Sequence, residues 1–192
     1  MLKASVYPSH FGNTSFTLTF EFINAGTNVL VATAQATYVL VDAKEFTKQT
    51  VKNMRLFVSG SAPLLTETFN TFQKVSGHTI LERYGMSETV MLVSNPYEGA
   101  RVGGSVGLPL PKTKVRITTD DGKLCGVNQI GSVEVKGPNV FKGYWRMPEK
   151  TKEEFTKDGW FKTGDVGRWG GETSAGKVPD NYLCIVGRSK DL

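Results

Sequence analysis

The chain has 192 residues, of which 39% are hydrophobic and 21% are charged, and it carries a formal net charge of +5. This length and apolar content are enough to bury a core and predict one or two globular domains. Lysines and arginines alternate with acids, and no basic run is interleaved with aromatic residues, so the sequence disfavours nucleic acid as a partner.

The first 45 residues carry the weakest pattern of the chain. Residues 29–41, VLVATAQATYVLV, predict a buried strand because they are almost continuously apolar. Residues 43–53, AKEFTKQTVKN, predict a short helix that ends near Asn53.

From residue 54 the pattern is that of a strand, a helix and a second strand. MRLFVSG (54–60) and HTILERYG (78–85) are short apolar runs that predict buried strands. Between them, apolar residues recur at helical spacing, with Thr66 as the expected N-cap and Gly77 as the expected C-cap. The order predicts a βαβ unit with two parallel neighbouring strands.

The two loops that follow these strands are SGSAP (59–63) and YGMSE (84–88). Loops after parallel strands lie at the carboxyl edge of the sheet, where ligands bind in open α/β folds. We therefore expect the two loops to face one ligand.

After about residue 100, short alternating segments and tight turns predict antiparallel strands, with a short helix over 147–159 and a polar hairpin over 170–181. The expected fold is α/β: part of a parallel βαβ-type sheet, followed by a β-rich, small barrel-like subdomain. We place the nucleotide-binding α/β part at 1–103, with 1–45 divergent, and the β-rich part at 104–192.

Several motifs are excluded. GGSVG (103–107) matches the GxSxG pattern of serine hydrolases, but it leads into LPLP rather than a helix, and both histidines precede Ser105. Neither a Walker A loop nor a GxGxxG fingerprint occurs. Cys125 and Cys184 are far apart without CxxC spacing, which predicts free thiols rather than a zinc site or a disulfide scaffold.

Candidate ligand-binding groups cluster in the two loops. Gly60, Ser61 and Ala62 either make a tight strand-to-helix connection or let a planar ligand approach the backbone. In RYGMSE (83–88), a stacking aromatic, a hydroxyl and a carboxylate suit a nucleotide with its magnesium. The alternative is an ordinary core tyrosine, a solvated ion pair and a helix N-cap.

Two further residues lie after predicted turns and strands. Asp165 could accept hydrogen bonds from the vicinal hydroxyls of a ribose, or it could cap a turn. Arg188 could bind a phosphate or a ribose, or it could be solvated near the terminus.

Six segments, in this order, resemble the successive core motifs of the adenylate-forming acyl-CoA synthetases: RLFVSGSAPL, LERYGMSET, GSVGLPLPKTKVRI, GYWRMPEKT, DGWFKTGDVG and YLCIVGRSKDL. The resemblance covers roughly residues 45 to 192, and SNPYEG and VKGPNVFKGYWRMPEKTK are most similar to the malonate-activating branch of that family. It implies an ATP- and Mg²⁺-dependent enzyme that activates a carboxylic acid as an acyl-adenylate and transfers it to CoA.

The resemblance also implies a role for each matching residue. Ser87 and Glu88 would be catalytic, and Glu88 would also bind the metal. Arg83 would bind the distal carboxylate of malonate, because a guanidinium fork can hold a carboxylate through two hydrogen bonds. Lys190 would lie at the hinge between two catalytic conformations. The residues that would contact ATP or AMP are Gly60, Ser61, Ala62, Pro63, Tyr84, Gly85, Met86, Ser87, Asp165 and Arg188.

The chain departs from the family pattern in two ways. The family's Gly-, Ser- and Thr-rich phosphate loop and its C-terminal lid domain with a catalytic lysine have no counterpart in these residues. Residues 170–180 look like an insertion in a usually shorter hairpin. We therefore expect a fragment of a malonate-activating synthetase, with little or no ligase activity by itself.

Two alternatives remain open. The acid could be a fatty, aryl or other dicarboxylic acid, or the chain could be a non-catalytic remnant that binds adenine nucleotide. Small molecules are the expected partners, no apolar stretch predicts a membrane span, and the oligomeric state is open. The expected compartment is the cytoplasm, or the mitochondrial matrix for a eukaryotic parent.

Overall fold

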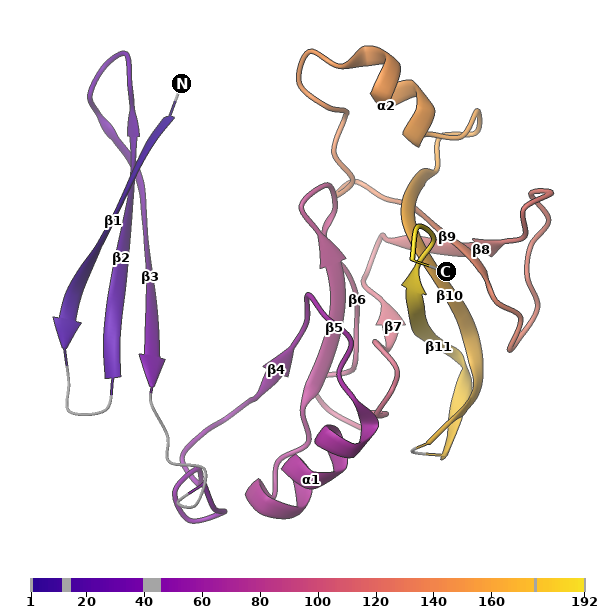
Figure 1. Cartoon of the computed structure of the whole chain (residues 1–192), viewed down its shortest axis with the longest axis horizontal. Helices are drawn as coiled ribbons and strands as arrows, with labels where there is room; N and C mark the ends of the chain where they lie inside the picture. The colour runs from indigo at the N-terminus through magenta and orange to yellow at the C-terminus, as the bar shows by residue number, and fades with distance from the viewer. Residues whose placement is uncertain (1, 12–14, 40–45, 175, 192) are drawn as a thin grey trace. The chain divides into compact units, whose positions relative to one another are not determined.

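The computed structural model describes residues 2–11, 15–39, 46–174 and 176–191, in two compact units, Met1–Val51 and Lys52–Leu192 (Figure 1). The first unit is an antiparallel sheet in the order β1-β2-β3. Its strands are β1 (Leu2–Phe11), β2 (Ser15–Asn24) and β3 (Leu30–Val39).

The strand predicted over 29–41 is confirmed over 30–39, where it forms β3, and residues 40–41 lie outside the described residues. Its predicted burial is wrong at the start of the strand. Leu30 and Val31 are 53% and 58% exposed. Adjacent residues of a strand point to opposite faces, so both faces of β3 are exposed at its start, and a run of apolar residues does not by itself establish burial.

The helix predicted over 43–53 is wrong in its described part, since residues 47–53 form turns and 43–45 lie outside the described residues. The Thr50 hydroxyl donates to the Thr47 carbonyl oxygen at 2.9 Å, and the Thr47 N–H donates to the Thr50 hydroxyl at 2.9 Å. Such local side-chain bonds compete with helical hydrogen bonding, which explains why no helix forms there.

The second unit begins with the predicted βαβ unit. Strands β4 and β5 are parallel neighbours, with Val58 opposite Leu81 and Ser59 opposite Glu82, which confirms the predicted pairing. The buried strand predicted over 54–60 is wrong in its extent and burial, because β4 contains only Val58 and Ser59 and Val58 is 46% exposed. The sheet order is β4-β5-β6-β7, and the later pairs are antiparallel, so the sheet is mixed. The elements are β4 (Val58–Ser59), α1 (Thr66–Ser76), β5 (Leu81–Met86), β6 (Val90–Ser94) and β7 (Leu108–Pro109).

Helix α1 ends as predicted but begins differently. Gly77 adopts a left-handed φ of 75°, and its N–H donates to the Gln73 carbonyl. At the other end Leu65 is the N-cap and no side chain caps the helix, so the expected role of Thr66 is wrong. Thr66 is already the first helical residue.

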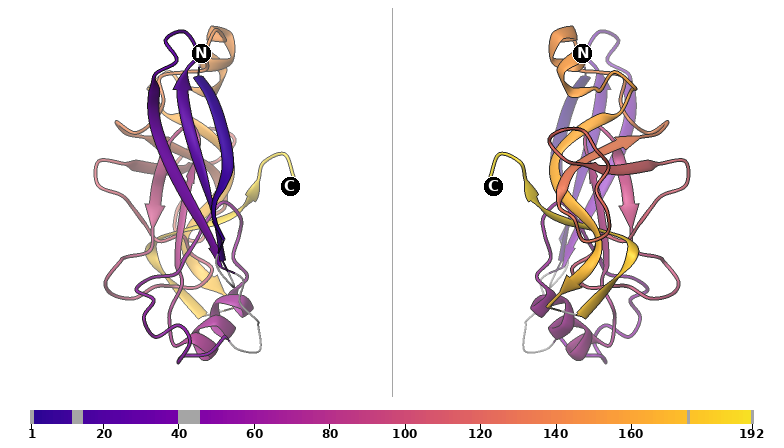
Figure 2. Two further views of the ribbon diagram at one scale, coloured as in Figure 1. Left: turned by 90° about the vertical axis from the view of Figure 1, so that its left-hand side faces the viewer. Right: turned by 90° about the vertical axis from the view of Figure 1, so that its right-hand side faces the viewer.

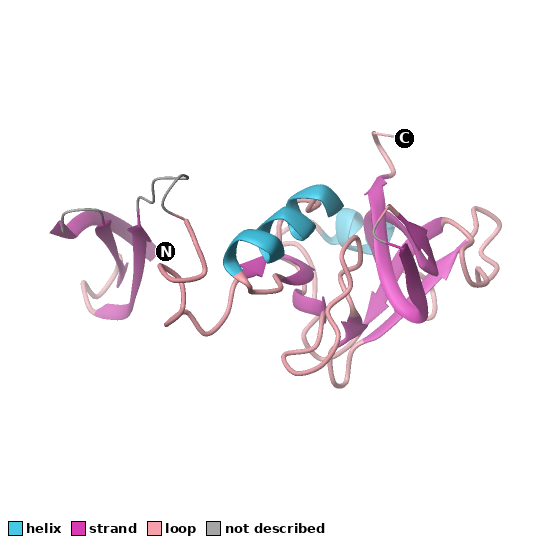
Figure 3. Cartoon of the chain, turned by 90° about the horizontal axis from the view of Figure 1, so that it is seen from below, coloured by secondary structure: helices cyan, strands magenta, loops and turns pink. Residues whose placement is uncertain are grey.

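The second sheet is antiparallel, in the order β11-β10-β9-β8, and includes the long β10–β11 hairpin whose twist is visible in Figure 2. Helix α2 (Pro148–Glu154) begins at its proline as predicted. Figure 3 shows that the regular structure of the second unit consists mainly of strands and not of helices. The strands are β8 (Lys114–Thr118), β9 (Gly131–Lys136), β10 (Phe161–Thr173) and β11 (Gly176–Arg188).

One hydrophobic core joins the two sheets of the second unit. An isolated β-bridge between Gly107 and Leu183 also links the two sheets. Strand β7, which follows the predicted boundary at 103/104, pairs with β6, which precedes it. The predicted boundary therefore falls inside one compact unit. The shared core fixes the end of β5 against β10 and β11. Its fully buried members are Leu92, Val93, Ile117, Val133, Val135, Phe161 and Leu183.

Candidate functional site

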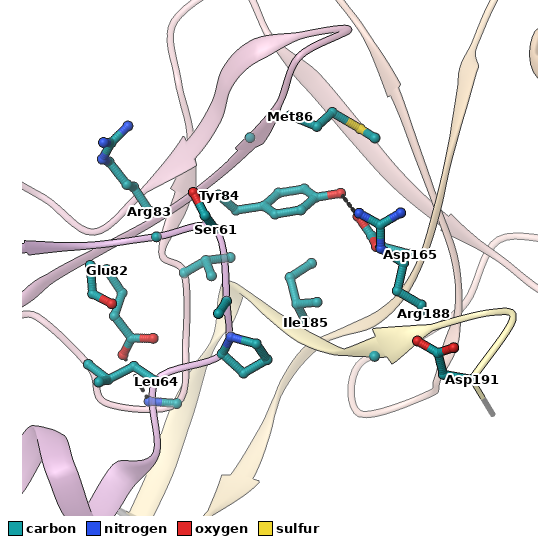
Figure 4. A pocket seen from close by; sticks show the side chains of 18 residues that line it. Ser61, Leu64, Glu82, Arg83, Tyr84, Met86, Asp165, Ile185, Arg188 and Asp191 are labelled. Atoms are coloured by element: carbon teal, nitrogen blue, oxygen red, sulfur yellow. Dashed lines mark hydrogen bonds and ion pairs between the residues drawn. The ribbon is translucent and has the colours of Figure 1, made fainter. Parts of the chain in front are cut away.

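A cavity of about 350 Å³ lies within the second unit, where the ends of β4 and β5 meet β10 and β11 (Figure 4). The two loops that were expected to face one ligand both contribute to its wall. The lining includes these residues predicted from the sequence: Gly60, Ser61, Ala62, Pro63, Arg83, Tyr84, Gly85, Met86, Asp165 and Arg188.

The loop after β4 forms one wall and runs close to the backbone of β5. A side chain at Gly60 would place its Cβ 3.2 Å from the Arg83 carbonyl oxygen, so a residue without a side chain suits this approach. Ser61 has a left-handed φ of 70°, which is uncommon for a residue other than glycine. Small residues and this tight turn leave the backbone itself facing the cavity.

Three polar side chains from β5, β10 and β11 meet on the opposite side. The Tyr84 hydroxyl donates to Asp165 Oδ2, and Arg188 forms an ion pair with Asp165, with 3.0 Å between Nε and Oδ1. Asp165 is only 5% exposed, whereas the side chain of Arg188 is 60% exposed. Burial, and then the Asp165 carboxylate, raise the pKa of Tyr84 far above its ordinary value, so the phenol remains a hydrogen-bond donor.

Glu82 is a cavity residue that the sequence interpretation missed. It is 6% exposed, and its Oε1 accepts a hydrogen bond of 3.3 Å from the Gly104 N–H. Burial raises the pKa of Glu82 from 4.5 to about 7. Alternation along β5 would have found it, because residues two apart in a strand face the same side, as Glu82 and Tyr84 do.

The other missed residues had no local signal. They come from segments that only the folded chain brings together, and Ile185 lies beside Tyr84 in Figure 4. These lining residues are Gly104, Val106, Ile185, Gly187 and Asp191, whereas Ser59 and Leu64 lie at the two ends of the predicted loop after β4.

Arg83 lies at the edge of the cavity and points away from Tyr84, Asp165 and Arg188 (Figure 4). Its Nη1 donates to the sulfur of Met91 at 2.7 Å. Within the described part of the chain, no carboxylate forms an ion pair with it.

Ser87, Glu88 and Lys190 do not line the cavity. Strand β5 continues to Met86, so Ser87 and Glu88 occupy the turn beyond the end of the strand. Glu88 instead accepts a hydrogen bond from the Tyr144 hydroxyl, with 3.1 Å between the oxygens.

The described residues contain no group of three or more His, Cys, Asp or Glu side chains placed to hold a metal ion. A single carboxylate such as Glu88 fits Mg²⁺, which usually takes one or two carboxylates and fills its other positions with phosphate oxygens and water. A metal ion held by Glu88 alone would need its other ligands from a bound phosphate group and from water.

Two further properties can be read from the described residues. Cys125 and Cys184 are free thiols, as predicted. Neither helix has the length and apolar character that a membrane crossing requires.

A cavity at the carboxyl edge of a βαβ unit, bordered by a small-residue turn and a buried Tyr–Asp pair, is typical of a domain that binds a nucleotide. The sequence profile of the AMP-binding enzymes matches residues 4–145. The chain belongs to the AMP-binding enzyme family. The matched range begins well before residue 45, where the resemblance to the family's core motifs was expected to begin.

Named relatives agree with this family. A malonate–CoA ligase of Arabidopsis thaliana is 45% identical over 138 residues, covering 72% of this chain and 21% of the relative. A mitochondrial malonate–CoA ligase of Xenopus laevis is 37% identical over 181 residues, covering 83% of this chain and 30% of the relative. The chain therefore spans less than a third of these relatives.

A solved structure supports the same relationship. The ATP-bound MatB of Rhodopseudomonas palustris is similar with a TM-score of 0.70 and 53% sequence identity. The match covers 77% of this chain and 28% of that protein. It confirms the expected fold of the α/β and β-rich parts.

Proposed function

We propose that the chain is the nucleotide-binding part of an AMP-forming acid–thiol ligase that activates malonate. In the first step, a malonate carboxylate oxygen attacks the α-phosphorus of ATP and displaces pyrophosphate. In the second step, the CoA sulfur attacks the acyl carbon and displaces AMP, while the thiol proton is released. The cavity formed by the two predicted loops is the observation that carries this proposal.

In this proposal the cavity holds the adenosine part of the nucleotide. The backbone of residues 60–63 and the ring of Tyr84 offer surfaces for the adenine, which favours stacking on a flat aromatic or peptide group. The Asp165 carboxylate, with Arg188 beside it, accepts hydrogen bonds from the ribose hydroxyls. A buried carboxylate held by a hydrogen bond and an ion pair is a rigid acceptor, and rigidity lowers the entropy lost on binding.

Ser87 and Glu88 would contact the phosphates at the end of β5, where Glu88 contributes one carboxylate to Mg²⁺. When bound, the ion neutralises negative charge on the phosphate groups. The chain's part is to orient Glu88 toward that position.

Arg83 is the proposed determinant of the acid. Its guanidinium lies at the cavity edge without an acidic partner in the described residues, so a ligand carboxylate can pair with it. A fatty acid tail would leave this charge unpaired and desolvated, which is unfavourable. This chemistry favours a dicarboxylate over the fatty and aryl acids that the sequence left open.

Calorimetric titration of the chain with ATP and AMP tests the nucleotide part of the proposal. We expect measurable binding that is weakened about tenfold by Asp165→Asn, the effect of weakening one charge-assisted hydrogen bond. Asp120→Asn changes an exposed carboxylate outside the cavity and should leave binding unchanged. A chain that releases no binding heat would be a structural remnant instead.

The acid is tested in the ligase-competent protein with a panel of malonate, succinate, benzoate and a fatty acid. Arg83→Met should reduce the kcat/KM for malonate more than that for monocarboxylic acids. Unchanged malonate turnover in that variant would contradict the assignment of Arg83.

The proposed compartment is the cytoplasm or the mitochondrial matrix. The mitochondrial relative from Xenopus laevis supports the second of these for a eukaryotic parent.

A further inference from the structure

Glu88 lies on a strained turn between β5 and β6. Val90, two residues further, has a left-handed φ of 58°, a conformation that is a genuine outlier for a β-branched residue. The turn is also tight, because a Cβ at Gly85 would lie only 1.9 Å from the Val90 carbonyl oxygen. Such strain persists only where the surroundings hold the backbone in place.

A loop from the second half of the chain supplies that support. The Asn139 side-chain amide donates to the Thr89 carbonyl at 2.8 Å and to the Met91 carbonyl at 3.0 Å, one on each side of Val90. The Phe141 N–H donates to the Glu88 carbonyl at 2.7 Å. Three hydrogen bonds therefore attach the Glu88 turn to one loop, which we call the clamp loop (137–144).

The same loop reaches the Glu88 carboxylate itself through Tyr144. The Tyr144 hydroxyl donates to Glu88 Oε1 at 3.1 Å. The ring is fixed by an edge contact with Phe141, at 4.8 Å between centroids, and the Tyr144 N–H donates to the Thr151 hydroxyl at 2.9 Å.

We propose that Tyr144 and Asn139 are positioning residues that hold Glu88 for metal–nucleotide binding. Asn139 fixes the backbone of the turn, and Tyr144 occupies one lone pair of Oε1, which sets the direction of the remaining acceptor positions. A second hydrogen bond of this kind typically tunes the affinity of a carboxylate for its metal. The inference rests on the proposed function, in which Glu88 contacts Mg²⁺ in the presence of ATP.

The test measures Mn²⁺ binding to the 192-residue chain in the presence of ATP by electron paramagnetic resonance, with Mn²⁺ as the probe for the Mg²⁺ position. Tyr144→Phe should weaken Mn²⁺ binding about tenfold, and Glu88→Gln by at least as much. The double variant should bind no more weakly than Glu88→Gln alone, because Tyr144 acts through Glu88. Unchanged affinity in Tyr144→Phe, or losses that add in the double variant, would overturn the proposal.

Asn139→Asp provides a second variant that keeps the size of the side chain but removes the amide donor. Asn139→Asp should weaken Mn²⁺ binding, and it should cause no further loss when it is combined with Glu88→Gln. Tyr182→Phe is the matched control, because its hydroxyl donates at 3.3 Å to the Ala100 carbonyl, away from Glu88. The control should leave Mn²⁺ affinity unchanged.

A readout without ligand separates this inference from the proposed function. The carboxyl carbon of Glu88 is followed by NMR in the ¹³C-labelled chain. Its chemical shift should change in Tyr144→Phe and stay constant in Tyr182→Phe. A chain that binds no ATP but shows this change contradicts the function and supports the positioning; an unchanged shift overturns the positioning, whatever the chain binds.

Discussion

Glu82 is a buried acid with one long hydrogen bond, and its environment makes the stability of the chain depend on pH. Its pKa is raised from 4.5 to about 7, so between these values the folded state keeps a proton that the unfolded state has lost. Stability therefore falls as pH rises through this window, by at most about 1.4 kcal/mol per pH unit. Above about pH 7 this contribution no longer changes.

The variant Glu82→Gln should remove this dependence, because an amide oxygen can still accept from the Gly104 N–H without becoming charged. In urea unfolding, we expect its free energy of unfolding to gain on that of the wild type between about pH 5 and about pH 8. Glu98→Gln, at an exposed position, is the control and should follow the wild type. Parallel curves for Glu82→Gln and the wild type would refute the burial argument.

Tyr84 and Asp165 give a second prediction for single residues. Tyr84→Phe would leave the buried Asp165 Oδ2 without its phenolic donor, and we expect a loss of about 1–3 kcal/mol of stability. Tyr97→Phe is the comparison. Because Tyr97 is 53% exposed, loss of its hydroxyl should lower the free energy of unfolding by less than about 0.5 kcal/mol. Denaturant midpoints of both variants measure the difference.

Among the elements, the β5–β6 hairpin is the one most sensitive to a single added carbon. Gly85→Ala would bring a Cβ to 1.9 Å from the Val90 carbonyl oxygen, so the hairpin must shift. We expect a destabilisation of about 3 kcal/mol, the upper range for overpacking. Gly126→Ala meets nothing within 4 Å and serves as the control. Equal melting temperatures for the two variants would show that the hairpin is more tolerant than its geometry indicates.

The elements also show what local sequence can predict. Gly77 was found as a C-cap because a left-handed residue after a helix favours glycine, whatever the helix packs against. The extension of β5 through Met86 was not found, because hydrogen-bonded pairing with β6, and not the apolar pattern of β5 alone, decides where the strand ends. The turn residues Ser87 and Glu88 therefore lie outside the cavity that their spacing had suggested.

At the scale of the whole molecule, the cavity was predictable where its residues follow the parallel strands. Tyr84 and Ser61 lie within one βαβ unit, so local topology brings them together. Ile185 and Gly104 meet them only through the core shared by the two sheets, and no pattern near either residue reveals that contact. The pairing of Tyr144 with Glu88 was hidden for the same reason, since 56 positions separate them.

The division into two units leads to a prediction about the whole chain. Every cavity-lining residue lies between Ser59 and Asp191, and the core that joins the two sheets comes from the same unit. Removal of residues 1–51 should therefore change the affinity for AMP by no more than about twofold, as expected for independent regions. Calorimetry compares the two chains, and circular dichroism verifies that the shorter one is folded. If the shorter chain were folded but bound AMP much more weakly, the first unit would have to support the nucleotide cavity.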